Sequence, residues 1–299
     1  MSFKKKITKL FNDAEIVEFD SKSKFVIMSD CHRGDGGLSD GFSRNQDIYF
    51  FALNHYYNDG FTYIELGDGD ELWENKKASD IIENYSNIFW LLSEFRKDNR
   101  LYCIFGNHDK VKKDRKYVNA NFSSFFDRSK NEEVPLFKNM KFHEALVLKY
   151  KYTENKILLL HGHQGDFFND EAWLFTRFLV RYLWKTLEKY RVNDPTSTAK
   201  NHKKKRVVEK KFSQWIEENK CLVITGHTHR PMFPEVGEIP YFNDGSCVHP
   251  RCITAIEIKN GNIELVKWCL AARQDGVLYI KRTSLEGSKN INSYFYKNE

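Results

Sequence analysis

The sequence predicts an α/β protein in which layers of strands and helices stack on one another. Five short apolar runs end abruptly in polar, Gly-containing loops, as expected of buried strands. They cover residues 25–28, 61–66, 101–105, 157–160 and 221–225. Two longer stretches with helical spacing, 46–58 and 78–97, separate the first three of these runs. Strands that alternate with helices are typical of layered α/β domains.

The last part of the chain predicts antiparallel strands. Two apolar runs, 252–258 and 262–270, flank Asn260-Gly261, a dipeptide that favours a two-residue hairpin turn. A further strand is expected over residues 276–282. The sheets are therefore expected to be mixed.

The composition excludes several classes of protein. Hydrophobic residues make up 41% of the 299 residues, which excludes a disordered chain. The six cysteines include no CxxC pair, so neither a disulfide scaffold nor a zinc ribbon is expected. No apolar run reaches the length of about 18 residues that spans a membrane, and residues 1–13 lack the apolar core of a signal peptide. We therefore expect a single cytoplasmic domain, 1–299, whose net charge of +6 suits anionic partners.

A long helical insertion, 165–220, is expected between the fourth and fifth strands. Apolar residues from Trp173 to Leu183 recur at helical spacing beside a basic stripe. The stripe consists of Arg177, Arg181, Lys185 and Lys189. A second helix carries an apolar face formed by Val208, Phe212, Trp215 and Ile216. We predict a helical hairpin that stands on the body of the protein as a cap.

Two roles are open for this insertion. We favour the arrangement in which its apolar face packs on the body and its basic face is solvated. Alternatively, the segment 171–211 holds an acyl chain or rests on an anionic membrane, which would place the protein at the membrane periphery. The basic run 203–206 also suits nucleic acid, but no nucleic-acid-binding motif accompanies it, so a nucleic acid partner is not expected.

Side chains that bind metal ions follow each of the five predicted strands. They are Asp30, His32, Asp68, Asn107, His161, His227 and His229. In Asp30-x-His32, alternation along an extended chain would aim both side chains into one pocket. Oxygen and nitrogen ligands without a thiolate suit Mn²⁺, which we expect, with Fe and Zn²⁺ as alternatives. Seven ligands are too many for one tetrahedral ion and suit two ions about 3.5–4 Å apart.

Five motifs that contain these residues occur in order along the chain. They are Asp30-x-His32, Gly67-Asp68-x-x-Glu71, Gly106-Asn107-His108-Asp109, His161-Gly162 and Gly226-His227-Thr228-His229. In these motifs the sequence resembles the calcineurin-like metallophosphoesterases, over residues 30–229 or about two thirds of the chain. The resemblance implies a four-layer α/β/β/α metallophosphoesterase sandwich that carries the helical hairpin as an insertion.

The resemblance also implies roles for the residues of these motifs. One divalent metal ion would be held by Asp30, His32 and His229, the other by Asn107, His161 and His227, and Asp68 would bridge the two. A hydroxide shared by the metal ions would attack phosphorus in line with the leaving oxygen. His108 would stabilise the developing charge or protonate the leaving group, and Glu71 would orient His108 unless it is a solvated loop acid.

Four further residues are neighbours of these ligands in the sequence. Arg33 and Arg230 each follow a ligand histidine, and they would bind a phosphoryl group as bidentate donors unless they are ordinary surface arginines. Asp109 and His163 are expected to support the ligands rather than to bind metal.

Within this superfamily the sequence is similar to the branch that contains UDP-2,3-diacylglucosamine hydrolases. The similarity lies in residues 67–73 and 226–231 and in the position of the insertion. It departs at His108, where the lipid A enzymes of that branch usually carry Arg, and at His163, where they carry Asp. The resemblance implies hydrolysis of a phosphodiester or pyrophosphate bond in a small, nucleotide-sugar or lipid-linked substrate. The alternatives are a phosphomonoesterase or protein phosphatase, a nuclease and a non-catalytic scaffold.

Overall fold

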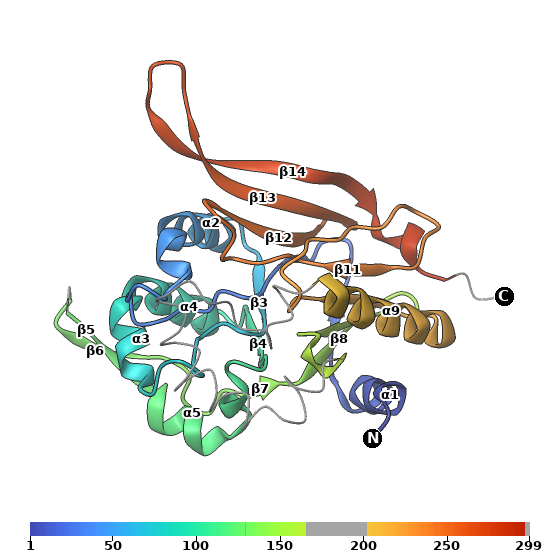
Figure 1. The fold of residues 1–299 in the computed structure, drawn as a ribbon, viewed down its shortest axis with the longest axis horizontal. Helices are drawn as coiled ribbons and strands as arrows, with labels where there is room; N and C mark the ends of the chain where they lie inside the picture. Colours follow the sequence, from blue (N-terminus) through green and yellow to red (C-terminus); the bar gives the residue numbers. More distant parts are fainter. Residues whose placement is uncertain (129, 166–201, 297–299) are drawn as a thin grey trace.

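Two β-sheets pack face to face, and helices cover the outer face of each sheet (Figure 1). The computed structural model describes residues 1–128, 130–165 and 202–296. One layer of apolar side chains lies between the sheets, and another lies beneath the helices on each side. The expected four-layer α/β/β/α sandwich is therefore confirmed.

The larger sheet has seven strands. In spatial order they are β14 (Leu278–Asn290), β13 (Asn262–Ala272), β12 (Cys252–Lys259), β2 (Lys24–Met28), β3 (Thr62–Leu66), β4 (Leu101–Ile104) and β7 (Phe142–His143). Strands β2, β3, β4 and β7 run parallel, whereas β12, β13 and β14 are antiparallel to their neighbours. This sheet is mixed, as expected.

The smaller sheet has five strands, which pair in the order β1 (Glu15–Phe19), β8 (Ala145–Tyr150), β9 (Lys156–Leu160), β10 (Leu222–Thr225) and β11 (Tyr241–Asn243). Only the β8–β9 pair is antiparallel. A separate hairpin, β5 (Ser124–Asp127) and β6 (Glu132–Pro135), lies outside both sheets.

Helices of the described residues cover the two sheets. They are α1 (Phe3–Asp13), α2 (Gln46–Asn58), α3 (Ala78–Asn84), α4 (Ser86–Lys97), α5 (Arg115–Asn121) and α9 (His202–Asn219). Short 3₁₀ turns are η1 (Phe42–Arg44), η2 (Lys110–Lys113), η3 (His163–Gly165) and η5 (Ile291–Tyr294). Helices α2 and α4 pack on the larger sheet, and α1 and α9 pack on the smaller one.

The apolar strands are buried on both faces, because each lies between a helical layer and the other sheet. In β2, Phe25 and Ile27 point between the sheets, whereas Val26 and Met28 point toward the helices. A continuous apolar run is the pattern that burial on both faces requires. The same run ends where the strand reaches the carboxyl edge of the sheet, and the polar loops begin there.

Most of the expected elements are present, with one split helix. The stretch 78–97 forms two helices, α3 and α4, because Tyr85 between them leaves the helical conformation. The buried hydroxyl group of Tyr85 donates a hydrogen bond to Asp40 Oδ2 at 2.6 Å. The hairpin at Asn260-Gly261 is confirmed, and both residues have the positive φ that such a turn requires.

The second half of the predicted insertion is described by the structure as helix α9. Helix α9 buries Val208, Phe212, Trp215 and Ile216 against α1 and the smaller sheet, so it forms part of the outer helical layer. The apolar face of α9 therefore packs on the body of the protein. The first half, including the basic stripe and most of segment 171–211, lies outside the described residues.

All six cysteines are free thiols, and four of them are buried. Among the helices that the structure describes, none has both the length and the apolar character needed to cross a lipid bilayer. Cytoplasmic residence stays a prediction.

Candidate metal centre

The ligand-bearing loops follow strands of both sheets and meet at one edge of the sandwich. Three of the loops follow β2, β3 and β4 of the larger sheet, and two follow β9 and β10 of the smaller sheet. Because the carboxyl ends of parallel strands lie at the same edge, polar side chains that are far apart in sequence come together there. The structure brings the candidate ligands into two groups, each made of three Asp or His residues.

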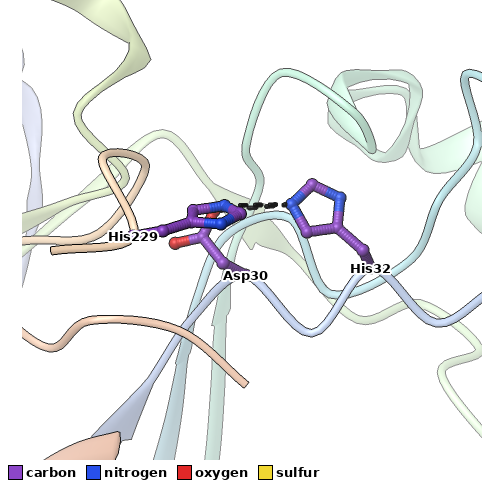
Figure 2. Close-up of side chains that lie close together, drawn as sticks. All are labelled: Asp30, His32 and His229. Atoms are coloured by element: carbon purple, nitrogen blue, oxygen red, sulfur yellow. Dashed lines mark hydrogen bonds and ion pairs between the residues drawn. The ribbon is translucent and has the colours of Figure 1, made fainter. Parts of the chain in front are cut away.

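The first group consists of Asp30, His32 and His229, which point toward one another in Figure 2. His229 Nε2 lies 3.0 Å from Asp30 Oδ1 and 3.4 Å from His32 Nε2. The second carboxylate oxygen of Asp30 accepts a hydrogen bond from the backbone N–H of His227 at 2.8 Å. Asp30 is fully buried, whereas both histidines are partly exposed, so this group opens toward solvent.

The second group consists of Asp68, His161 and His227, all of which are buried. His161 Nδ1 donates a hydrogen bond to the backbone carbonyl of Leu66 at 2.9 Å. That bond leaves the lone pair of Nε2, which lies 3.1 Å from Asp68 Oδ2, available to a metal ion. The groups adjoin, since Asp68 Oδ2 is also 3.8 Å from His32 Nε2.

Asn107 lies in the loop that packs against Asp68. Its side-chain oxygen is buried and has no hydrogen-bond partner among the described residues. The neighbouring His108 backbone N–H donates to Asp68 Oδ1 at 2.8 Å. A Cβ atom at Gly106 would lie 2.1 Å from the same oxygen, so only glycine allows this close approach. A buried carbonyl oxygen without a donor is a natural place for a cation.

The backbone conformation of the ligands differs from the expected alternation of an extended strand. Asp30, His32, Asp68, His227 and His229 all have positive φ values, between 48° and 67°. Strand β2 ends at Met28, so the two side chains of Asp30-x-His32 converge from left-handed backbone rather than from a pleated strand. Intervening Cys31 points into the helix-side core. Left-handed conformations of non-Gly residues are uncommon and cluster at functional sites.

His108 is held between Glu71 and Trp73. Its Nδ1 lies 2.8 Å from Glu71 Oε1, and its ring stacks on Trp73 with centroids 4.2 Å apart. The other oxygen of Glu71 lies 2.9 Å from His32 Nδ1. Glu71 is buried, so the structure excludes the solvated-acid alternative: one carboxylate orients a candidate ligand and His108 at the same time.

The electrostatics of the site fit a bound cation. Burial would raise the pKa of Asp68, but the imidazoles of His161 and His108 hold it below its usual value. Burial would lower the pKa of His161, whereas Asp68 and Asp30 raise it to about 9. Asp68 and Asp30 thus favour positive charge at His161, and a divalent cation would supply positive charge at the same place. Together with the buried Asn107 oxygen, this donor set suits metal ions.

Arg33 does not face the site, which corrects the expectation that it binds a phosphoryl group. Its guanidinium group is completely buried, with Nη1 2.8 Å and Nη2 3.0 Å from the carboxylate of Glu65. Its Nε donates to Asp70 Oδ1 at 2.6 Å. These hydrogen bonds direct both edges of the guanidinium into the interior, because the chain turns inward after His32. It is not a surface arginine either.

Arg33 belongs to a buried ion network beneath the ligands. The network consists of Arg33, Glu65, Asp70, Asp109 and Lys112. Lys112 Nζ lies 2.6 Å from Asp70 and 3.0 Å from Asp109. Asp109 Oδ1 accepts the backbone N–H of Gly106 at 2.7 Å, which braces the loop of Asn107. The network thus connects the loops after β2, β3 and β4, and Asp109 supports a candidate ligand from behind.

Two other candidates, Arg230 and His163, lie next to the two ligand groups. Arg230 is exposed and lies 3.4 Å from Glu209 of α9, so its role as a phosphoryl-binding residue stays a prediction. His163 is buried with its ring 5.6 Å from that of His161, and neither ring nitrogen has a hydrogen-bond partner among the described residues. Burial and the neighbouring His161 hold the pKa of His163 well below its usual value.

Sequence reasoning missed a polar pair behind Asp30. The Ser29 hydroxyl group lies 2.6 Å from Asp30 Oδ2 and 2.7 Å from Asp244 Oδ1, and all three residues are buried. Asp244 follows β11, where the polar run after an apolar strand was the available signal. The pair fixes the orientation of the Asp30 carboxylate.

The whole ligand-bearing region matches a family model. The model, described as calcineurin-like phosphoesterase, covers residues 23–231 of this chain. That range includes both ligand groups, His108 and the buried ion network. Among curated proteins, no match was found.

Solved structures with a similar outline include two vacuolar protein sorting 29 proteins. The one from Cryptosporidium parvum is 15% identical, with a TM-score of 0.39, and the match covers 89% of this chain and 98% of that one. The one from Chaetomium thermophilum is 10% identical, with a TM-score of 0.37 and coverages of 89% and 96%. A protein from Staphylococcus aureus described as a 5′-nucleotidase is 11% identical, with a TM-score of 0.34 and coverages of 86% and 52%. Similarity this low says nothing about what this chain binds or does.

Proposed function

Because the chain belongs to the calcineurin-like phosphoesterase family, we propose that it hydrolyses a phosphodiester or pyrophosphate bond with the help of two divalent metal ions. We expect Mn²⁺ at the site and a small, nucleotide-sugar or lipid-linked substrate. The observation that carries this proposal is the meeting of two ligand groups around Asp68, next to a histidine that Glu71 holds in place.

The first metal ion would be held by Asp30, His32 and His229, and the second by Asn107, His161 and His227, with Asp68 shared. Two such cations would supply Lewis acidity that activates water and offsets charge on the phosphoryl oxygens. The partly exposed first group is the one through which a substrate would enter.

His108 would act on the leaving group. Its Nδ1 is occupied by Glu71, so Nε2 is the ring nitrogen left to face a substrate. From there it would donate a proton or a hydrogen bond to the leaving oxygen. Stacking on Trp73 fixes the plane of the ring and shields one of its faces from water.

A hydrolysis panel with purified protein tests the proposal. Chelator-treated protein is reloaded with Mn²⁺, and bis-p-nitrophenyl phosphate, p-nitrophenyl phosphate and a UDP-sugar pyrophosphate are compared. We expect turnover of the diester or the pyrophosphate that depends on added metal and disappears in Asp68→Asn. Glu18→Gln, at an exposed position of β1, is the matched control and should retain full activity. A preference for the monoester would replace this proposal with a phosphomonoesterase, and no turnover with any metal would favour a scaffold.

A further inference from the structure

A pocket of about 200 Å³ lies beside the metal centre, between the loop before α2 and the loop before β12. Its polar lining includes Arg44 and His249, and we call it the Arg44 pocket. Its apolar lining consists of Leu38, Val248 and Pro250. A smaller recess that contains His32 and Glu71 shares part of the same wall, from residue 39 to residue 41. The Arg44 pocket therefore adjoins the first ligand group.

The wall of the Arg44 pocket is held in place by buried hydrogen bonds. The side-chain amide of Asn45 donates to the carbonyl oxygens of Cys247 at 2.8 Å and His249 at 2.7 Å. In turn, the backbone N–H of Cys247 lies 3.3 Å from the carbonyl oxygen of Asp30. The segment that carries His249 is thus tied both to the segment that carries Arg44 and to a candidate ligand, so the pocket is preformed.

Asp40 is the acidic residue among those that line the Arg44 pocket, and its carboxylate is already engaged. It accepts hydrogen bonds from the backbone N–H groups of Gly34, Gly36, Phe42 and Ser43 and from the hydroxyl group of Tyr85. Five donors around one carboxylate offset much of its negative charge. It therefore shapes the loop and presents little repulsion to an anion.

The other charged groups around the Arg44 pocket include Arg44 in its lining, Lys205 of α9, and the carboxylate of Asp30, which belongs to the first ligand group. Arg44 is exposed and makes no hydrogen bond or ion pair within the described residues. His249 Nε2 is buried and also lacks a hydrogen-bond partner there. Lys205 of α9 is near enough for its charge to act on His249, and Arg230 acts in the same way on Lys205. The guanidinium group of Arg44 and the ring nitrogen of His249, both without a partner among the described residues, suit an oxyanion next to the candidate metal centre.

We propose that the Arg44 pocket binds a second phosphoryl group of the substrate, adjacent to the one that is hydrolysed. The inference rests on the proposed function and narrows its substrate to compounds with two neighbouring phosphoryl groups, such as a pyrophosphate. Arg44 would donate two hydrogen bonds to this group, and His249 lies in the same lining. The apolar side of the pocket would contact the substituent that the second group carries.

Calorimetric titration of Mn²⁺-loaded protein tests the pocket without turnover. The probes are methylenediphosphonate and methylphosphonate, which carry two phosphonate groups and one. Arg44→Gln should weaken binding of methylenediphosphonate about tenfold, the size expected for charge-assisted hydrogen bonds, and change methylphosphonate binding less than about twofold. Arg44→Lys should recover part of the loss. Arg115→Gln, at an exposed position of α5, removes the same charge elsewhere and should change neither affinity.

The possible outcomes separate the pocket from the reaction. If Arg44→Gln lowers the affinity for both probes equally, or for neither, the proposal that the Arg44 pocket binds a second phosphoryl group is wrong. Selective loss in Arg44→Gln, combined with no hydrolysis of any substrate by the wild-type protein, would support the pocket and contradict the proposed function. If the wild-type protein hydrolyses the diester and Arg44→Gln leaves both probe affinities unchanged, the proposed function stands. The proposal that the Arg44 pocket binds a second phosphoryl group is then wrong.

Discussion

The basic residues beneath the metal centre and those at its rim differ in what surrounds them. Arg33 and Lys112 beneath it are buried, and each contacts two carboxylates. Arg44 and Arg230 at the rim are exposed, and Arg230 lies 3.4 Å from Glu209, its ion-pair partner among the described residues. A buried, fully paired cation holds loops together, whereas an exposed one is available to a ligand. Arg33 and Arg230, which both follow a candidate ligand histidine, therefore lie in different surroundings.

The largest expected effect on activity is at Asp68, which lies between these two regions. The change Asp68→Asn removes a charge that both ligand groups share, so we expect kcat/KM for the diester to fall about 10³-fold or more. Far-ultraviolet circular dichroism should stay unchanged, because the amide has the same shape. Activity within about tenfold of wild type would show that this carboxylate does not hold the metal ions.

A large effect on stability is expected beneath the centre. Arg33→Met removes one side of a buried ion network and leaves Glu65 and Asp70 without their partner, which should lower the free energy of unfolding by about 3–5 kcal/mol. Urea unfolding of the metal-free protein measures it. Arg230→Met makes the same change at the rim and should cost less than about 1 kcal/mol. Equal midpoints for the two variants would erase the distinction between the regions.

A moderate effect on activity is expected at Glu71. Glu71→Gln keeps the side chain's size but weakens its hold on His32 and His108, so we expect kcat to fall about 10–100-fold. Steady-state kinetics with the diester, at saturating Mn²⁺, provide the measurement. Because Glu71 contacts two functional histidines, Glu71→Gln combined with His108→Ala should lose less than the product of the single losses. Independent, multiplicative losses would contradict the shared contact.

The smallest effect is expected at the exposed Arg230. Arg230→Gln should raise KM for the diester by no more than about fivefold and leave kcat unchanged, since a solvated ion contributes about 1 kcal/mol or less. Its KM should approach that of wild type at high salt, where the charge is screened. A loss of kcat would instead place Arg230 in contact with the transferring group.

The sequence was most informative where the signal is local. The five strand-end loops and the candidate ligands that they bring together could be located because each apolar run ends in a polar motif a few residues long. The burial of Arg33 could not be predicted, because its partners Glu65 and Asp70 are more than thirty residues away along the chain. The same holds for Glu71, whose contact with His32 joins two loops.

Helix α9 shows a different limit. Its apolar face was visible in the sequence, but a face of this kind packs equally well on a cap partner or on the body. The positions of α1, whose Ile7 joins the same buried cluster, and of the smaller sheet settle where this face packs. Five candidate ligands have a left-handed backbone, and no side-chain pattern in the sequence indicates the sign of φ. The sequence therefore predicted that the side chains of Asp30 and His32 converge, but for the wrong geometric reason.

The left-handed backbone at five candidate ligands lowers the stability of the loops while it brings the ligand side chains together. For a residue other than glycine, this conformation costs roughly 1–2 kcal/mol compared with right-handed backbone. A glycine at position 32 or 229 would relax the loop while deleting a donor. The loops that carry these donors therefore keep a local strain that the surrounding buried hydrogen bonds hold in place. In His32→Gly and His229→Gly, the relief of that strain would be set against the loss of a partner for the buried carboxylate of Asp30.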